Sequence, residues 1–233
     1  MSTLLLQLSG PLQAWGDSSR FAYRTTRREP TKSGVIGLLA AAQGRERTAD
    51  LADLVGLRFG VRIDQVGRVI QDFQTEIDWR TGKSKPLTHR QYLADAKFVA
   101  ALEGPSTVLD GIVESIKSPV FPLFLGRRSC PPSSPVFLSL QDGDLETELQ
   151  SWPWIASDWY KRKQPKTIQL AISRDCKTGE NPDEMIRDLP VCFEQRNRRH
   201  ELRPVIHSFT QPFTNPLGNE DDPHNPYSLL GGV

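Results

Sequence analysis

The apolar positions of this chain recur with periods that change from segment to segment and so predict its secondary structure. A continuous apolar run from Thr3 to Leu8 predicts a central strand that is buried on both faces. The apolar residues from Val35 to Ala42 recur at helical spacing, and Thr31 or Ser33 precedes them as a suitable N-cap. Apolar and polar residues alternate strictly from Leu57 to Asp64, which predicts a second strand because strand side chains point alternately to opposite faces.

A basic, turn-rich segment interrupts the next alternating region. Residues 69–77 and 91–102 alternate as strands do, whereas residues 78–90 follow no period and are rich in basic and turn-forming side chains. We therefore expect a protruding hairpin with a long loop. A helix capped by Ser106 follows, with apolar residues at i, i+3, i+4 and i+7, and a last strand is expected near residues 121–125.

The resulting order, strand-helix-strand-strand-helix-strand, predicts an α+β fold of the ferredoxin-like or RNA-recognition-motif (RRM-like) class. We assign this fold to residues 1–135, with an insertion at about 78–93. Residues 136–233 are expected to form a smaller, mostly β C-terminal portion that ends in an extended tail. Its expected strands are residues 136–140, 167–173, 191–196 and 202–209. Because many functions share this fold class, the fold alone does not decide the function.

Composition excludes several classes of protein. The 233 residues are 37% hydrophobic and 24% charged, which is typical of a globular protein. No run approaches the about 18 consecutive apolar residues of a membrane span, and the N-terminus does not resemble a secretory signal. The three cysteines form no C-x-x-C pair, and the histidines have no companion at ligand spacing. We expect a cytoplasmic protein with no disulfide framework, metal site or other cofactor, and with no membrane partner.

The total formal charge is only +1, but the positive charge is concentrated locally. Residues 20–32 contain five basic residues and one acid, a local charge of +4. This segment ends at the start of the first expected helix, where free N–H groups and the helix dipole attract anions. Arg127 and Arg128 lie on a proline-stiffened loop, and their guanidinium groups suit a phosphate or the face of a base. We therefore expect an anion-facing edge that binds RNA, and the lack of a G-x-x-x-x-G-K-[ST] motif argues against nucleotide hydrolysis.

Four sequence blocks together resemble one known family. They are Leu6 to Gly16 (L-x-L-x-G-P-L-Q-A-W-G), Pro30 to Leu39 (P-T-K-S-G-V-I-G-L-L), Arg90 to Ala96 (R-Q-Y-L-A-D-A) and Leu125 to Pro131 (L-G-R-R-S-C-P). In this order the blocks are similar to those of the CasD subunits of type I-E CRISPR Cascade complexes, a family within the RAMP superfamily. The resemblance covers roughly the first 140 residues, so nothing is carried over to the C-terminal portion.

The resemblance implies a non-catalytic subunit that holds the 5′ handle of a guide RNA in antiviral defence. Members of the family project a thumb-like hairpin that kinks the RNA, and they contact the adjacent backbone subunit and the large subunit. Here the thumb would lie between about Asp78 and Leu93. Combining the resemblance with the basic segments, we expect the RNA to contact Arg24, Arg27, Arg28, Lys32, Ser33, Arg90, Tyr92, Arg127, Arg128 and Ser129.

Two other functions fit parts of the sequence. Some RAMP relatives cut precursor guide RNA without metal, through tyrosine, lysine and histidine side chains, and Tyr23, Lys85 and His89 supply these residue types. The Lys-His dipeptide of those relatives is absent from the chain. General acid–base catalysis also needs groups held within hydrogen-bond reach, which a long loop does not ensure. The second alternative is a scaffold that binds only other proteins.

Overall fold

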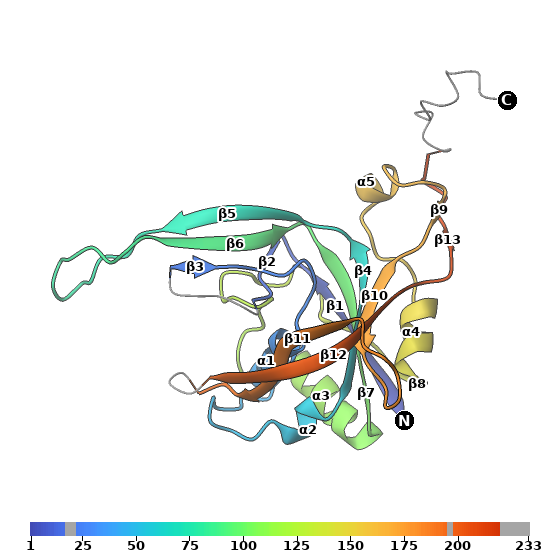
Figure 1. Ribbon diagram of the computed structural model, residues 1–233, viewed down its shortest axis with the longest axis horizontal. Coiled ribbons are helices and arrows are strands. Elements are labelled where there is room, and N and C mark those ends of the chain that lie inside the picture. Colours follow the sequence, from blue (N-terminus) through green and yellow to red (C-terminus); the bar gives the residue numbers. More distant parts are fainter. Residues whose placement is uncertain (17–21, 195–197, 220–233) are drawn as a thin grey trace.

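A computed structural model describes residues 1–16, 22–194 and 198–219, which form a mixed α+β structure (Figure 1). Its centre is one seven-stranded sheet in which every neighbouring pair of strands is antiparallel. In sheet order the strands are β11 (Glu184–Cys192), β12 (Arg199–Phe209), β10 (Ala171–Asp175), β4 (Arg58–Gln65), β7 (Lys97–Gly104), β1 (Ser2–Ser9) and β8 (Phe137–Asp142).

Helices pack on both faces of this sheet. α1 (Lys32–Ala42) and α3 (Ser106–Lys117) share one buried cluster with Leu4 of β1. α4 (Leu145–Ser151) lies on the opposite face, in a cluster with Leu5 of β1. Because consecutive side chains of β1 enter different clusters, this strand is buried on both faces, as its continuous apolar run predicts. Two short helices, α2 (Ala52–Val55) and α5 (Asp158–Lys161), are also present.

A second, smaller sheet is centred on β6 (Thr88–Ala94). β5 (Arg68–Gln74) pairs antiparallel along one edge of β6, and the two strands form a hairpin that projects from the body (Figure 1). β2 (Leu12–Gln13) and β3 (Tyr23–Arg24) pair with the other edge of β6, β2 antiparallel and β3 parallel. The base of the hairpin therefore belongs to a four-stranded sheet. A separate pairing joins β9 (Thr167–Ile168) to β13 (Phe213–Thr214).

Several expected elements agree with the structure. The runs at residues 3–8 and 57–64 form β1 and β4. α1 begins after Thr31, whose Oγ1 accepts a hydrogen bond from the backbone N–H of Gly34 at 3.2 Å. α3 also forms where expected, but its N-cap is Pro105, so Ser106 is its first residue rather than its cap.

The last strand of the expected fold was placed wrongly. No strand forms at residues 121–125, which follow Pro119 and include Pro122. Proline has no N–H to donate to a ladder, so this segment is a poor strand. The sixth element is instead β8, which pairs with the free edge of β1. The boundary expected at residue 135 therefore does not coincide with a break in the sheet, because β8 completes it and β10, β12 and β11 extend it beyond β4.

The run at residues 91–102 is two strands and not one. It is broken at Asp95, which has a positive φ of 57°, so β6 and β7 leave this point in different sheets. The hairpin thus comprises 68–94, and the insertion expected at 78–93 covers only its loop and returning strand. In the C-terminal portion β11 and β12 pair as a hairpin, but β11 shares only residues 191–192 with the strand expected at 191–196. The strand expected at 167–173 is divided between β9 and β10. Of the expected tail, residues 220–233 lie outside the described part of the chain.

Arg62 forms a fully buried ion pair within β4 and also links this strand to the end of α4. Its Nε and Nη2 donate to the two carboxylate oxygens of Asp64 at 2.8 and 2.9 Å, and both side chains are 0% exposed. The same guanidinium donates to the carbonyls of Leu149, Trp152 and Pro153, at and just beyond the C-terminus of α4. Burial raises the pKa of the Asp64 carboxyl, and the hydrogen bonds from Arg62 only partly offset this effect.

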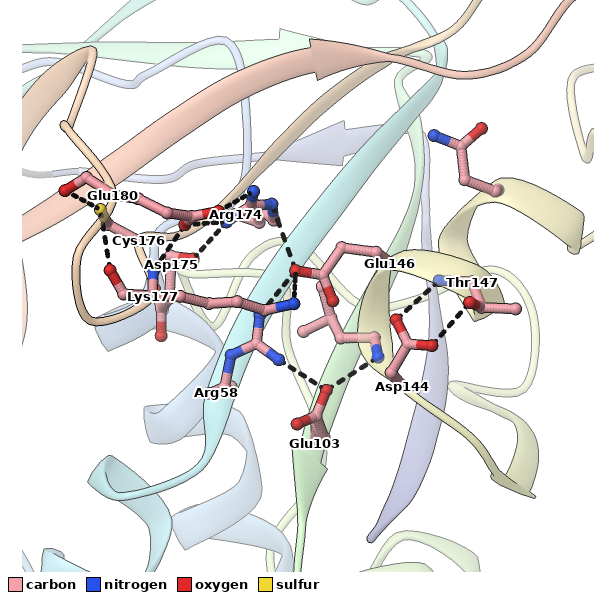
Figure 2. A network of polar contacts seen from close by, with 12 residues as sticks. Arg58, Glu103, Asp144, Glu146, Thr147, Arg174, Asp175, Cys176, Lys177 and Glu180 are labelled. Atoms are coloured by element: carbon pink, nitrogen blue, oxygen red, sulfur yellow. Dashed lines mark hydrogen bonds and ion pairs between the residues drawn. The ribbon is translucent and has the colours of Figure 1, made fainter.

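A second network, more exposed, joins the turn after β10 to α4 and β4 (Figure 2). The Glu146 carboxylate accepts from Arg58 Nη2 at 2.8 Å and lies 2.8 Å from Lys177 Nζ. Burial acts to raise the pKa of Glu146, but the hydrogen bonds from Lys177 and Arg58 outweigh it and lower that pKa. Arg58 also donates to Glu103 of β7 at 2.7 Å. One guanidinium on β4 therefore contacts both the neighbouring strand β7 and the helix α4.

We expect Arg62→Met to lower the free energy of unfolding by about 3–5 kcal/mol, because Asp64 would stay buried without its cation. Urea denaturation at pH 7 measures the loss. The difference in the free energy of unfolding between the variant and the wild type should decrease as the pH falls, because a protonated, neutral Asp64 carboxyl does not need a cation beside it. As a control, Lys85→Met removes an exposed contact with Asp78 at 3.8 Å and should change the stability by less than about 1 kcal/mol. Equal losses in the two variants would contradict this reading of Arg62.

Candidate nucleic-acid interface

The loop that carries Arg127 and Arg128 is fixed against the first segment of the chain. Gly126 has a φ of +86°, and a Cβ at this position would lie 1.7 Å from the carbonyl oxygen of Ala14. Only glycine fits so close an approach in this conformation. The backbone N–H of Ala14 donates to the carbonyl of Leu125 at 3.0 Å, which holds the two segments together.

Arg127 joins two strands of the smaller sheet. Its Nη1 donates to the carbonyl of Gln91 on β6 at 2.9 Å, and its Nη2 donates to the carbonyl of Arg24 on β3 at 3.0 Å. The guanidinium lies 4.8 Å from the centre of the Tyr92 ring, a cation–π contact. Tyr92 is only 4% exposed, so the structure places it inside the protein rather than on an RNA-facing edge. Arg127 thus positions β3 beside β6.

Other members of the expected set do lie on the surface near this junction. Arg24, Arg28 and Arg128 are exposed, as is Ser129, and we call the three arginines the arginine surface. Because Arg127 bonds the carbonyl of Arg24, the segment that begins at β3 and the Arg127–Arg128 loop are direct neighbours. The arginine surface therefore gathers charge from segments about 100 residues apart in the chain.

Arg90 and Arg27 are held by acidic partners. Arg90 is half-buried on β6, opposite Arg24 on β3, and its Nη2 lies 3.4 Å from Glu76. Arg27 donates to the Glu184 carboxylate at 3.0 Å. Burial acts to raise the pKa of Glu184, but the hydrogen bonds from Arg27 and His207 outweigh it and lower that pKa. Arg27 thus anchors the basic segment to β11.

Lys32 and Ser33 lie inside the protein, which corrects the sequence-based expectation. Lys32 is 4% exposed, and its Nζ donates to Asp175 Oδ2 at 2.9 Å and to the Leu57 carbonyl at 2.7 Å. Its backbone N–H donates to Asp188 Oδ2 at 2.7 Å, so a carboxylate of this same chain occupies the N-terminus of α1. Ser33 is 5% exposed, with its Oγ 3.5 Å from Thr31 Oγ1.

Arg203 completes this buried cluster, in which two cations meet two carboxylates. Its Nε and Nη2 donate to Asp188 at 2.7 and 2.8 Å, and its Nη1 donates to Asp175 at 2.7 Å. Burial acts to lower the pKa of Arg203, but its contacts with Asp188 and Asp175 outweigh this and raise it. We call Lys32, Asp175, Asp188 and Arg203 the seam cluster, because it joins α1 to β10, β11 and β12.

Three aromatic residues that the sequence did not bring together meet on one face of the smaller sheet. Tyr23 of β3 pairs in register with His89 of β6, and their rings stack with centroids 4.9 Å apart and planes 10° apart. Phe73 of β5 lies opposite His89 on the other side. Tyr23 and Phe73 are 62% and 67% exposed, and we call the three the aromatic row. The alternation of apolar and polar residues predicted which face of its strand Phe73 occupies. Only the pairing register of β5, β6 and β3 showed that His89 and Tyr23 lie beside it.

The remaining chemistry of the described residues is limited. Among residues 1–16, 22–194 and 198–219, no group of three or more His, Cys, Asp or Glu side chains is arranged to hold a metal ion. Within these same ranges, none of the helices has the length and apolar character needed to cross a membrane. Lys85, one of the three residue types of a cleaving site, lies on the hairpin loop with its Nζ 3.8 Å from Asp78.

Comparisons with known proteins agree with these features. Residues 3–206 match the family described as CRISPR-associated protein (Cas_Cas5). The CRISPR system Cascade subunit CasD of Escherichia coli (strain K12) is 35% identical over 183 residues, which are 70% of this chain and 82% of that protein. A crystal structure of a Cas protein has 35% identity and a TM-score of 0.70, covering 95% of this chain and all 100% of the other. A chain of a CRISPR RNA-guided surveillance complex has 27% identity and a TM-score of 0.74, covering 98% of each chain.

We expect Lys32→Met to act on stability. It should lower the free energy of unfolding by about 3–5 kcal/mol, because two buried carboxylates would then share one cation. Arg28→Met, an exposed cation of the same basic segment, should change it by no more than about 0.5 kcal/mol. Thermal and urea denaturation of the two variants measure the difference. A Lys32→Met variant as stable as the wild type would contradict the structural role of the seam cluster.

Proposed function

Because the chain belongs to the CRISPR-associated protein family Cas_Cas5, we propose that it is a non-catalytic subunit of a type I-E Cascade surveillance complex that holds the 5′ handle of the guide RNA. Its partners are the guide RNA, the adjacent backbone subunit and the large subunit. The relatives support this assignment, since one is named as a Cascade subunit and another is part of an RNA-guided surveillance complex. A cytoplasmic location belongs to the proposal, and the three free cysteines suit a reducing compartment.

The arginine surface is the observation that carries the RNA-binding proposal. Arg24, Arg28 and Arg128 are exposed beside the base of the projecting hairpin, where Arg127 fixes two segments to each other. Exposed guanidinium groups on fixed backbone are well suited to phosphates, which they contact through two parallel hydrogen bonds. Arg90 and Ser129 border this surface and are proposed as further RNA contacts.

The projecting hairpin is proposed to be the thumb that shapes the RNA. β5 and β6 carry it away from the body (Figure 1), and β3 supports its base on one edge. The name ferredoxin-like also belongs to this proposal. It is supported by the element order β1-α1-β4-β7-α3-β8 and by the sheet order β4-β7-β1-β8, with α1 and α3 packed on one face.

We expect the arginine surface to determine how strongly guide-RNA binding depends on salt. Each phosphate contact on single-stranded RNA contributes about −0.7 to the slope of log affinity against log salt. The triple variant Arg24→Ala, Arg28→Ala, Arg128→Ala should therefore have a slope shallower by about 2. Filter binding of guide RNA over a salt series measures it.

Arg187→Ala, which removes an exposed arginine on β11, is the matched control and should leave the slope unchanged. A protein-only scaffold would behave differently. It would purify without RNA, and the triple variant would retain its partner subunits and bind RNA no worse than the wild type. Either result would refute the RNA-binding proposal.

Cleavage of precursor guide RNA is the second candidate, and the contact between Tyr23 and His89 is the observation that favours it. These side chains are two of the three residue types that metal-independent RAMP ribonucleases use. The geometry also weighs against it, because the rings stack face to face and Gln71 Nε2 donates to His89 Nδ1 at 3.2 Å. That contact engages Nδ1, one of the two nitrogens of the imidazole ring.

We expect no specific cleavage when the purified chain is incubated with repeat-containing RNA and a metal chelator, and no change in His89→Ala. Gel analysis of end-labelled RNA measures the products. Cutting at one position that disappears in His89→Ala but persists in Lys85→Ala would establish a nuclease with a histidine-dependent mechanism. Such a result would overturn the non-catalytic assignment and leave the RNA-binding proposal intact.

A further inference from the structure

We infer that the aromatic row, Tyr23, His89 and Phe73, is a stacking platform for unpaired bases of the bound RNA. This inference rests on the proposed RNA-binding function and adds a site that the arginine surface does not include. Arginines that contact phosphates position the RNA strand but do not by themselves hold its bases. Single-stranded RNA is bound most effectively where a basic groove and aromatic rings lie together.

The ring geometry suits nucleobases. Tyr23 and His89 stack with planes only 10° apart, so they present parallel flat surfaces instead of an edge. Tyr23 is 62% exposed, which leaves much of its ring accessible to a planar ligand. On the other side of His89, in the next strand, Phe73 is 67% exposed. Three adjacent strands thus present rings at neighbouring positions on one sheet face.

The orientation of the central ring is fixed by the sheet. Gln71 Nε2 donates to His89 Nδ1 at 3.2 Å, and the backbone N–H of His89 donates to the carbonyl of Ala22 at 2.7 Å. A ring held in this way loses little conformational freedom when a base stacks beside it. Gln71 and Gln91 are opposite each other in the register on this face, and their amides offer hydrogen-bond donors and acceptors for base edges.

Charge favours RNA as the occupant over an apolar protein surface. Arg24 follows Tyr23 directly on β3, and its carbonyl accepts a hydrogen bond from Arg127, the chain neighbour of the exposed Arg128. The acidic residues of the hairpin loop are already engaged, since Glu76 lies 3.4 Å from Arg90 and Asp78 lies 3.8 Å from Lys85. A polyanion that contacts the arginine surface would therefore bring its bases to the aromatic row without meeting an unpaired hairpin-loop carboxylate.

The test pairs protein variants with guide RNAs from which single bases have been removed. The full chain is assembled with its partner subunits, and the probes are guide RNAs that carry an abasic site at each 5′-handle position in turn. Tyr23→Ala should weaken binding of intact guide RNA about 5- to 100-fold, because stacking on one ring contributes about that much. The salt slope should stay unchanged, since no phosphate contact is lost. Phe73→Ala should also weaken binding, and Tyr23→Phe should bind like the wild type.

The abasic probes identify stacking directly. At one handle position the abasic RNA should bind the wild type as weakly as intact RNA binds Tyr23→Ala, and combining both changes should add no further loss. Trp159→Ala is the matched control, because Trp159 on α5 is a 49% exposed aromatic ring that does not belong to the aromatic row, and its loss should not change RNA affinity. Melting curves of all the variants establish that they are folded.

Each other outcome has a separate meaning. If Tyr23→Ala and Phe73→Ala bind RNA like the wild type, the stacking inference is wrong, while a shallower salt slope in the arginine triple variant would still support the proposed function. If these variants release partner subunits with unchanged RNA affinity, the aromatic row is a protein contact and the inference is again wrong. If the wild type does not bind guide RNA, the proposed function fails and the inference fails with it.

Discussion

The seam cluster is the interaction on which the rest of the structure depends. Lys32 and Arg203 meet Asp175 and Asp188 at hydrogen-bond distance, at the N-terminus of α1. Charges buried this deeply persist only when each has a partner, so the four side chains must be assembled together. Because they come from α1, β10, β11 and β12, their assembly fixes the three C-terminal strands against the N-terminal half.

This constraint also determines which surface remains available for function. With the N-terminus of α1 closed by Asp188, the anion-binding capacity of that helix is used within the protein. Exposed arginines of the expected RNA-binding set remain instead at Arg24, Arg28 and Arg128. The basic segment before α1 therefore serves two purposes, because Lys32 stabilises the fold while Arg24 and Arg28 contribute to the arginine surface.

The hairpin depends on a few backbone positions that redirect the chain. Asp95, with its positive φ, separates β6 from β7, so one continuous pattern supplies strands to two sheets. Gly126 lets the arginine-bearing loop approach Ala14 closely, and Arg127 from that loop bonds carbonyls of β3 and β6. The same contacts that support the hairpin thus place cations beside it and align the rings of the aromatic row.

The sequence by itself determined the periodic elements and the uneven charge. Local periodicity predicts β1, α1, β4 and α3, because the apolar residues that each element buries recur within one short segment of the sequence. Only the tertiary structure decided which basic residues are exposed, since Lys32 and Arg28 are both cations of one basic segment and differ only in what packs over them. Periodicity did not predict that β8 pairs with β1 at the sheet edge, or that the chain breaks at Asp95 between two strands. It also did not predict the strand register that aligns Tyr23, His89 and Phe73. The pairing of β1 with β8 and the register of the aromatic row arise from contacts between residues far apart in the chain, which no local pattern encodes.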